Sequence, residues 1–260
     1  MQKPGKYRSE KKLVNEFPAL YHAHHARHPE DIPFWIGLAQ KQAGPVLELG
    51  CGTGRVLIPL AQVCPSAFGL DNDANMLAFL HRSLPPTLHS RINVWLADLA
   101  AFHLETHFPL IVLPCNTYST LPKEKRQKML ALVHHHLEAG GIFAVSMPNP
   151  EYLIRLPANA ESEMEEIFPH PSDGEPVQVS SSWKRTGRTF SFNWNYDHLL
   201  PDGRVARTPA QVRHFLESPQ NYLEELTNAG FEKPLLLGDF DGSPYDNDSP
   251  HLILIATRRS

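Results

Sequence analysis

The chain has 260 residues and a formal net charge of −4, and it lacks any long block of basic residues, which argues against binding to nucleic acid. Its length suits one α/β domain with an insertion or a small second lobe, and 42% hydrophobic residues can supply a core. No apolar run approaches the ~18 residues of a membrane span, and three sparse cysteines favour a reducing, cytoplasmic location.

The N-terminal part of the chain has the spacing of helices. Phe17, Leu20 and Tyr21 recur at helical intervals, and Pro33 opens a second apolar stretch. We therefore expect a helical N-terminal segment within residues 1–44.

A strand, a glycine-rich turn and a helix follow this segment. Residues 46–49 form a short apolar run, the turn has the spacing G-x-G-x-G at Gly50, Gly52 and Gly54, and residues 56–63 have a helical pattern. Glycine is favoured here because a Cβ atom would keep a ligand away from the backbone or exclude positive φ angles. The spacing differs from the G-x-G-x-x-G of nicotinamide-binding proteins, which argues against an NAD-dependent oxidoreductase.

The next elements alternate between strands and helices, and we expect them at residues 68–71, 73–82, 91–96, 110–113, 122–137 and 142–147. Two of the strands lead into carboxylates, Asp71 and Asp98. Gly140-Gly141 is expected to end the last of these helices.

The pattern changes in the segment that follows. Residues 148–174 are rich in proline and contain an acidic run, and residues 177–205 read as antiparallel strands. The alternation then resumes at Ser218-Pro219, which predicts an N-cap followed by proline at the first helical position. The remaining elements are this helix, which ends near Asn228, and strands at residues 235–238 and 251–257.

The glycine turn and its neighbouring carboxylates resemble the motifs of the class I (Rossmann-like) S-adenosylmethionine (SAM)-dependent methyltransferases. The resemblance rests on Glu48 before the turn, Asp71 after the second strand, Met76-Leu77 in the next helix, and Asp98. It implies an α/β, Rossmann-like methyltransferase fold with a seven-stranded mixed sheet whose last strand is antiparallel. The implied domains are an N-terminal helical lid (1–44), a SAM-binding core (45–147 and 208–260) and an antiparallel β insertion that roofs the acceptor site (148–207).

The resemblance also implies how each part of SAM is bound. The glycine turn lies under the methionine moiety, Glu48 organises the turn or the amino group, Asp71 accepts from the ribose hydroxyls, and Asp98 accepts from the adenine amino group. The expected cofactor-binding residues are Tyr21, Glu48, Gly50, Cys51, Gly52, Gly54, Asp71, Asn72, Met76, Asp98, Leu99 and Cys115.

The expected activity is transfer of a methyl group to a nitrogen or oxygen atom of a small molecule. Methyl transfer is an in-line displacement that depends mainly on alignment of the reactants, so we assign no single catalytic residue from the sequence. Side chains considered near the acceptor are Tyr118, Asn149, Tyr152, Arg155, Trp194, Tyr196, His198, Arg213, His214, Asp239 and Tyr245. Among them, Tyr118, Tyr196, His198 and Arg213 are the catalytic candidates.

Two alternatives stay open: a non-catalytic SAM-binding or scaffold protein, and a methyltransferase with a macromolecular acceptor. Enzymes that methylate DNA bases or protein glutamine usually carry N-P-P-Y-like or D-P-P-Y-like residues after the fourth strand, where this chain has Pro114-Cys115-Asn116-Thr117. The sequence does not decide the acceptor, the choice between N, O and C methylation, the use of a general base, or the oligomeric state.

Two groups of histidines raise the question of a metal site. His22, His24, His25 and His28 lie in one expected helix, and a second group occupies residues 134–136. Neither group has a carboxylate or cysteine at a convincing spacing in the sequence, so we expect no metal.

Overall fold

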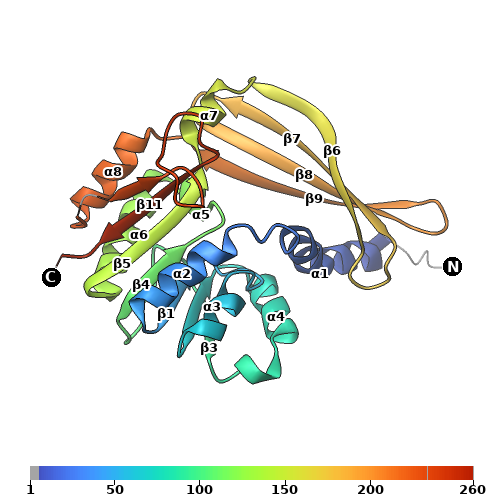
Figure 1. The fold of residues 1–260 in the computed structure, drawn as a ribbon. Coiled ribbons are helices and arrows are strands. Elements are labelled where there is room, and N and C mark those ends of the chain that lie inside the picture. The colour runs from blue at the N-terminus through green and yellow to red at the C-terminus, as the bar shows by residue number, and fades with distance from the viewer. Residues whose placement is uncertain (1–5, 233, 260) are drawn as a thin grey trace. The chain divides into compact units, whose positions relative to one another are not determined.

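The computed structural model describes residues 6–232 and 234–259, with side chains described from residue 16 onward. The chain divides into two compact units (Figure 1). One unit comprises residues 30–156, 186–190 and 214–260, and the other comprises residues 1–29, 157–185 and 191–213. Among the described residues, no helix combines the length and apolar character needed to cross a bilayer.

The larger unit is built on a seven-stranded sheet with the order β10-β11-β5-β4-β1-β2-β3. Its strands are β1 (Val46–Leu49), β2 (Ala67–Asp71), β3 (Ile92–Leu96), β4 (Phe108–Leu113), β5 (Leu137–Pro148), β10 (Leu235–Leu237) and β11 (His251–Thr257). β11 runs antiparallel to both of its neighbours, and the remaining pairs are parallel. The expected mixed sheet with an antiparallel last strand is therefore confirmed.

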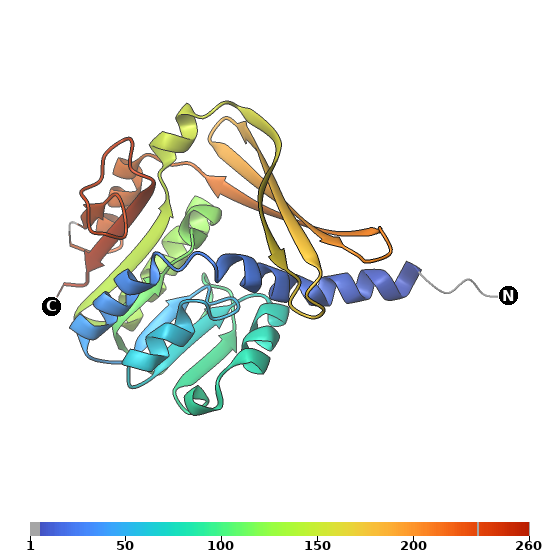
Figure 2. The ribbon, with the colours of Figure 1, turned by 45° about the vertical axis from the view of Figure 1, so that its right-hand side comes forward.

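Helices cover both faces of this sheet (Figure 2). One layer contains α2 (Ile32–Gln42), α3 (Leu57–Val63) and α4 (Ala74–Ser83), and the other contains α5 (Thr117–Thr120), α6 (Lys123–His136) and α8 (Pro219–Asn228). A short 3₁₀ helix (Pro86–Leu88) and α7 (Pro150–Arg155) complete the unit. All four residues of β1 are buried, as expected for a central strand covered on both faces.

Two helix starts show how local sequence set the element boundaries. Asp73 caps α4, because its side chain accepts hydrogen bonds from the backbone N–H groups of Asn75 and Met76. Ser218 caps α8 and accepts from the Asn221 N–H, with Pro219 at the first helical position as predicted.

The expected role of Gly140-Gly141 and the expected start of β5 were wrong. The helix ends at His136, within one residue of the expected end, but β5 begins directly after it and Gly140-Gly141 lie within the strand. Pairing of β5 with β4 jumps from Leu137 to Ile142, so the intervening residues bulge out. Gly140 has a φ angle of +75°, and a Cβ atom on Gly141 would lie 2.9 Å from a backbone oxygen. The two glycines therefore allow a β-bulge in β5 and do not end a helix.

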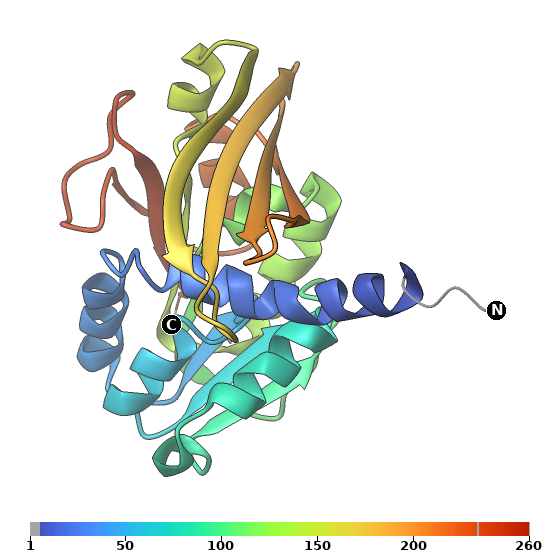
Figure 3. The same cartoon turned by 90° about the vertical axis from the view of Figure 1, so that its right-hand side faces the viewer.

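The smaller unit combines α1 (Lys6–His25) with a four-stranded sheet of order β6-β7-β8-β9, and Figure 3 shows α1 running crosswise to the strands. The strands are β6 (Asn159–Pro169), β7 (Pro176–Thr186), β8 (Thr189–Leu199) and β9 (Val205–Phe215). Leu20 of α1 packs in a buried cluster with Phe168, Val177, Val179 and Tyr196. The antiparallel β insertion is therefore present.

Sequence reasoning underestimated this sheet. It did not predict β6, which contains the acidic run, and the sheet continues to Phe215 instead of ending near residue 207. Most side chains of β6 are exposed, so the strand lacks the apolar alternation by which strands are recognised. Charged side chains on such an edge strand disfavour pairing with another chain.

Candidate functional site

The glycine turn follows β1 at the carboxyl end of the parallel strands. Gly50, Gly52 and Gly54 have φ angles of +68°, +51° and +83°, which L side chains rarely adopt. A Cβ atom on Gly54 would also lie 2.4 Å from the Leu80 side chain. The N–H of Cys51 donates to the Leu70 carbonyl at 3.0 Å, so the turn is anchored to β2.

Asp71, at the end of β2, organises the same turn. Its Oδ2 accepts from the Gly52 N–H at 2.7 Å, and its Oδ1 accepts from the Asp73 N–H at 2.8 Å. Partial burial raises the pKa of Asp71, and these backbone donors oppose that rise. A carboxylate has about four lone-pair positions, so Asp71 can still accept hydrogen bonds from a ligand.

Glu48 lies beneath the turn and is 2% exposed. Among the described residues, its Oε2 has no hydrogen-bond partner. Burial raises the pKa of Glu48 well above its usual range, while Arg55 acts in the opposite direction. A buried carboxylate oxygen without a donor is costly, so this position suits a ligand that supplies a cationic amine.

Sequence reasoning assigned no role to the ion pair that flanks the turn. Both terminal nitrogens of Arg55 donate to Asp31 at 2.7 Å, and one also donates to the Cys115 sulfur at 3.0 Å. Asp31 further accepts from the indole N–H of Trp35 at 3.0 Å. Arg55 was visible in the glycine motif, but nothing in the sequence paired it with Asp31, which lies 24 residues earlier.

The other expected cofactor residues of this unit lie along the same strand ends. Asp98 follows β3, is 45% exposed, and accepts from the Lys125 ammonium group at 2.8 Å, which lowers the pKa of Asp98. Leu99 is buried, Met76 is half-buried and Asn72 is exposed. Their roles in binding the adenosine part stay predictions.

The short helix α5, which follows β4, contacts both the glycine turn and the buried side chain of His214. Thr117 of α5 lies next to Gly50, where a Cβ atom would contact its side chain at 3.3 Å. Ser119 of the same turn donates to the Asn116 carbonyl at 3.0 Å, and its Oγ lies 2.9 Å from Nδ1 of His214. His214 therefore donates through Nδ1–H, which leaves the Nε2 lone pair as its basic position.

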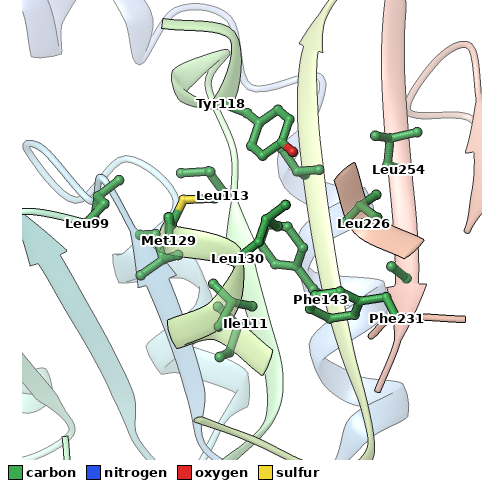
Figure 4. Close-up of a cluster of buried hydrophobic side chains, with 14 of the residues drawn as sticks. Leu99, Ile111, Leu113, Tyr118, Met129, Leu130, Phe143, Leu226, Phe231 and Leu254 are labelled. Atoms are coloured by element: carbon green, nitrogen blue, oxygen red, sulfur yellow. The ribbon is translucent and has the colours of Figure 1, made fainter. Parts of the chain in front are cut away.

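Tyr118, a catalytic candidate from the sequence, lies in the core (Figure 4). Its side chain is fully buried, and its hydroxyl donates to Glu225 at 3.2 Å. Burial raises the pKa of Tyr118 well above its usual range. We therefore interpret Tyr118 as a structural residue.

The remaining acceptor candidates of the larger unit surround the loop before β11. Asn149 is buried and caps α7, donates to three carbonyls of that loop, and accepts from the Tyr245 hydroxyl at 2.7 Å. Arg155 donates to Asp248 at 2.7 Å. Tyr152 is exposed, and Asp239 accepts from its neighbouring backbone N–H. These contacts hold the loop against the end of β5.

Residues 46–141 match the family model of a methyltransferase domain. The chain contains a methyltransferase domain. A SAM-dependent methyltransferase from Clostridium acetobutylicum ATCC 824 shares its fold with a TM-score of 0.78 and 14% identity, covering 95% of this chain and 99% of that chain. CalS10 from Micromonospora echinaspora is an amino pentose methyltransferase solved with SAM bound. It shares the fold with a TM-score of 0.72 and 19% identity, covering 92% of this chain and 96% of that chain.

A curated relative has a different kind of acceptor. The Drosophila melanogaster tRNA N(3)-methylcytidine methyltransferase Mettl2 is 25% identical over 185 residues, which is 68% of this chain. The chain spans 57% of the length of that relative. The class I family and the enzyme class predicted from the sequence are confirmed by these comparisons, and SAM, the cofactor bound in CalS10, is the cofactor of this family.

The other predicted residues belong to the smaller unit of the chain. Tyr21 packs against His25, with ring centroids 4.2 Å apart. Tyr196 is buried, and Trp194 packs on Phe192 with ring centroids 4.4 Å apart. The expected roles of Tyr21 in cofactor binding and of Trp194 and Tyr196 around the acceptor stay predictions.

Two catalytic candidates of this unit also stay untested. His198 is buried and stacks on His170 with ring centroids 3.9 Å apart, and Arg213 is exposed near the end of β9.

Proposed function

We propose that this methyltransferase transfers the methyl group of SAM to a nitrogen or oxygen atom of a small molecule. The observation that carries the cofactor part is the buried Oε2 of Glu48, which has no partner among the described residues and lies below a turn of three left-handed glycines. This carboxylate fits the amino group of SAM, and Asp71 fits its ribose hydroxyls. SAM supplies the electrophilic methyl group.

The chain's own contribution to the transfer is alignment. The nucleophile needs a free lone pair that points at the methyl group. We propose that Nε2 of His214 accepts a hydrogen bond from the N–H or O–H group of a neutral acceptor and so orients that lone pair. Burial lowers the pKa of His214 to about 4, so the imidazole is neutral at physiological pH, and Ser119 fixes its tautomer.

Two observations support a small acceptor. The net charge of −4 disfavours a phosphate backbone. CalS10, which shares the fold over 92% of this chain, acts on an amino pentose. The roles expected for residues 1–44 as a lid and for residues 148–207 as a roof belong to the same proposal.

The relationship to Mettl2 supports a second candidate, methylation of RNA. A non-catalytic binding role is less well supported because residues 46–141 match a methyltransferase domain. In the same assay, RNA methylation predicts methylated tRNA, whereas a non-catalytic role predicts binding of SAM without any product.

The test follows formation of S-adenosylhomocysteine when the full chain is incubated with SAM and either a panel of amino sugars and phenols or total tRNA. We expect turnover with a member of the small-molecule panel and none with tRNA. Calorimetry should show micromolar binding of SAM and no binding of NAD. Methyl incorporation into tRNA alone would establish the second candidate, and NAD binding without SAM binding would overturn both.

The His214→Ala variant tests this positioning role. At pH 7.5 its kcat/KM for the acceptor should fall, with partial recovery in His214→Gln, while SAM affinity stays unchanged. An unaltered kcat/KM in His214→Ala would exclude His214 from orienting the acceptor.

A further inference from the structure

Three ligand-type side chains converge between α1 and β6, in the smaller unit. Nε2 of His24 lies 3.3 Å from Oε1 of Glu166, and Nε2 of His28 lies 3.4 Å from the same oxygen. The two histidines are four residues apart on one helix, and Glu166 lies 138 residues after His28 in the sequence. The sequence has no carboxylate at a metal-binding spacing from these histidines, but the fold brings Glu166 beside them.

The two nitrogen–oxygen separations match those expected between neighbouring ligands of a metal ion, and all three ligand atoms lie within 4.8 Å of one another. Zinc–ligand bonds of ~2.0–2.2 Å in a tetrahedron place neighbouring ligand atoms about 3.4 Å apart. The observed 3.3 and 3.4 Å are longer than an ordinary N–H···O hydrogen bond of about 2.9 Å. The two imidazole planes are inclined at 81°, so they intersect and one ion can lie in both planes.

Neighbouring side chains orient the ligands as in known metal sites. Nδ1 of His24 lies 3.0 Å from the Tyr196 hydroxyl, so the opposite ring nitrogen faces Glu166. Arg27 donates to Oε2 of Glu166 at 2.9 Å, which leaves Oε1 toward the histidines. Oε2 of Glu165 lies 3.9 Å from Nε2 of His24 and could supply a further ligand. Such outer contacts fix ligand orientation in metal sites.

The two other clusters of this kind among the described residues fit an ion less well. His170 and His198 both approach Asp173, but their rings are parallel within 3° at 3.9 Å, so their in-plane lone pairs cannot point at one ion. In the cluster of His103, His135 and His136, both ring nitrogens of His136 are already used, by the Leu104 N–H and the Leu132 carbonyl.

We propose that His24, His28 and Glu166 bind a divalent transition-metal ion of the zinc type, which joins α1 to β6. Two imidazoles and one carboxylate suit Zn²⁺, whereas Mg²⁺ and Ca²⁺ prefer oxygen ligands. His28 is 56% exposed at its side chain, so an ion can enter from solvent.

The experiment measures Zn²⁺ binding to the metal-free full chain by competition with a chromophoric chelator. It also records the visible spectrum after addition of Co²⁺. We expect one tight equivalent of Zn²⁺, a tetrahedral Co²⁺ spectrum, and a higher Tm with metal. His28→Gln and Glu166→Gln should each weaken Zn²⁺ binding by about tenfold or more.

Asp173→Asn and His135→Gln are the matched controls, since they alter the other two clusters and should leave Zn²⁺ binding unchanged. Far-ultraviolet circular dichroism of each metal-free variant checks that it folds. The proposal is overturned if the wild-type chain binds no Zn²⁺, or if His28→Gln binds it as tightly as the wild type. It is also overturned if only the control variants lose binding.

Discussion

At the scale of single residues, Asp71 holds the glycine turn and is the residue that we propose to bind the ribose hydroxyls. Asp71→Ala should weaken SAM binding by roughly 1.5–3 kcal/mol, the range for hydrogen bonds to charged groups. Asp71→Asn, which keeps one oxygen acceptor, should lose less. Isothermal calorimetry measures both affinities, and thermal melting shows whether the turn is intact. If a folded Asp71→Ala variant binds SAM as tightly as the wild type, Asp71 only stabilises the loop and does not bind the ribose.

A second prediction at this scale concerns His214 and the dependence of folding stability on pH. Its pKa is about 4 in the folded chain, against 6.5 for an ordinary histidine, and it is 6% exposed. The folded state therefore binds fewer protons than the unfolded state below pH 6.5. Stability is complete above that pH and falls as the pH approaches 4.

The expected cost at pH 5 is about 2 kcal/mol from this residue. Urea unfolding of the wild-type chain and of His214→Gln at pH 7.5 and pH 5 isolates its share, because other buried histidines remain in both chains. An identical pH dependence in the two chains would show that His214 protonates freely when folded.

At the scale of elements, α6 and α8 are joined by a buried ion pair. Arg126 donates to both oxygens of Glu225 at 2.8 and 2.7 Å, and both side chains are almost inaccessible. Glu225→Ala leaves a buried guanidinium without its partner and should destabilise the fold by about 3–5 kcal/mol. Replacing both residues by Met and Leu should cost much less.

Glu224→Ala, at the exposed neighbouring position, is the matched control and should change stability by less than about 0.5 kcal/mol. Denaturant unfolding monitored by circular dichroism provides the comparison. If Glu225→Ala and Glu224→Ala are equally stable, the ion pair does not hold the two helices together.

At the scale of the whole molecule, charge bears on the choice between acceptors. The densest basic run, residues 123–128, lies on α6, where Lys125 pairs with Asp98 and Arg126 is buried. Lys125 and Arg126 are therefore poorly placed to neutralise phosphates, which leaves only two lysines of the run, Lys123 and Lys128, for that role. We expect tRNA binding weaker than ~1 μM at physiological salt in a filter-binding assay. Tight, salt-dependent binding would favour an RNA acceptor.

The sequence by itself determined the features that depend on neighbours along the chain. The cap at Ser218, the glycine turn and the alternation of strands and helices were all readable, because each is recorded in the residue types and spacing of a short stretch of chain. The sheet with its antiparallel last strand also followed from the family resemblance.

Only the tertiary structure decided which distant side chains meet. It placed Glu166 beside His24, Asp31 beside Arg55, and Ser119 beside His214. It also moved Tyr118 from the expected site into the core and made a strand of the exposed acidic run. Such contacts form because separate elements are packed together, and no local periodicity records them.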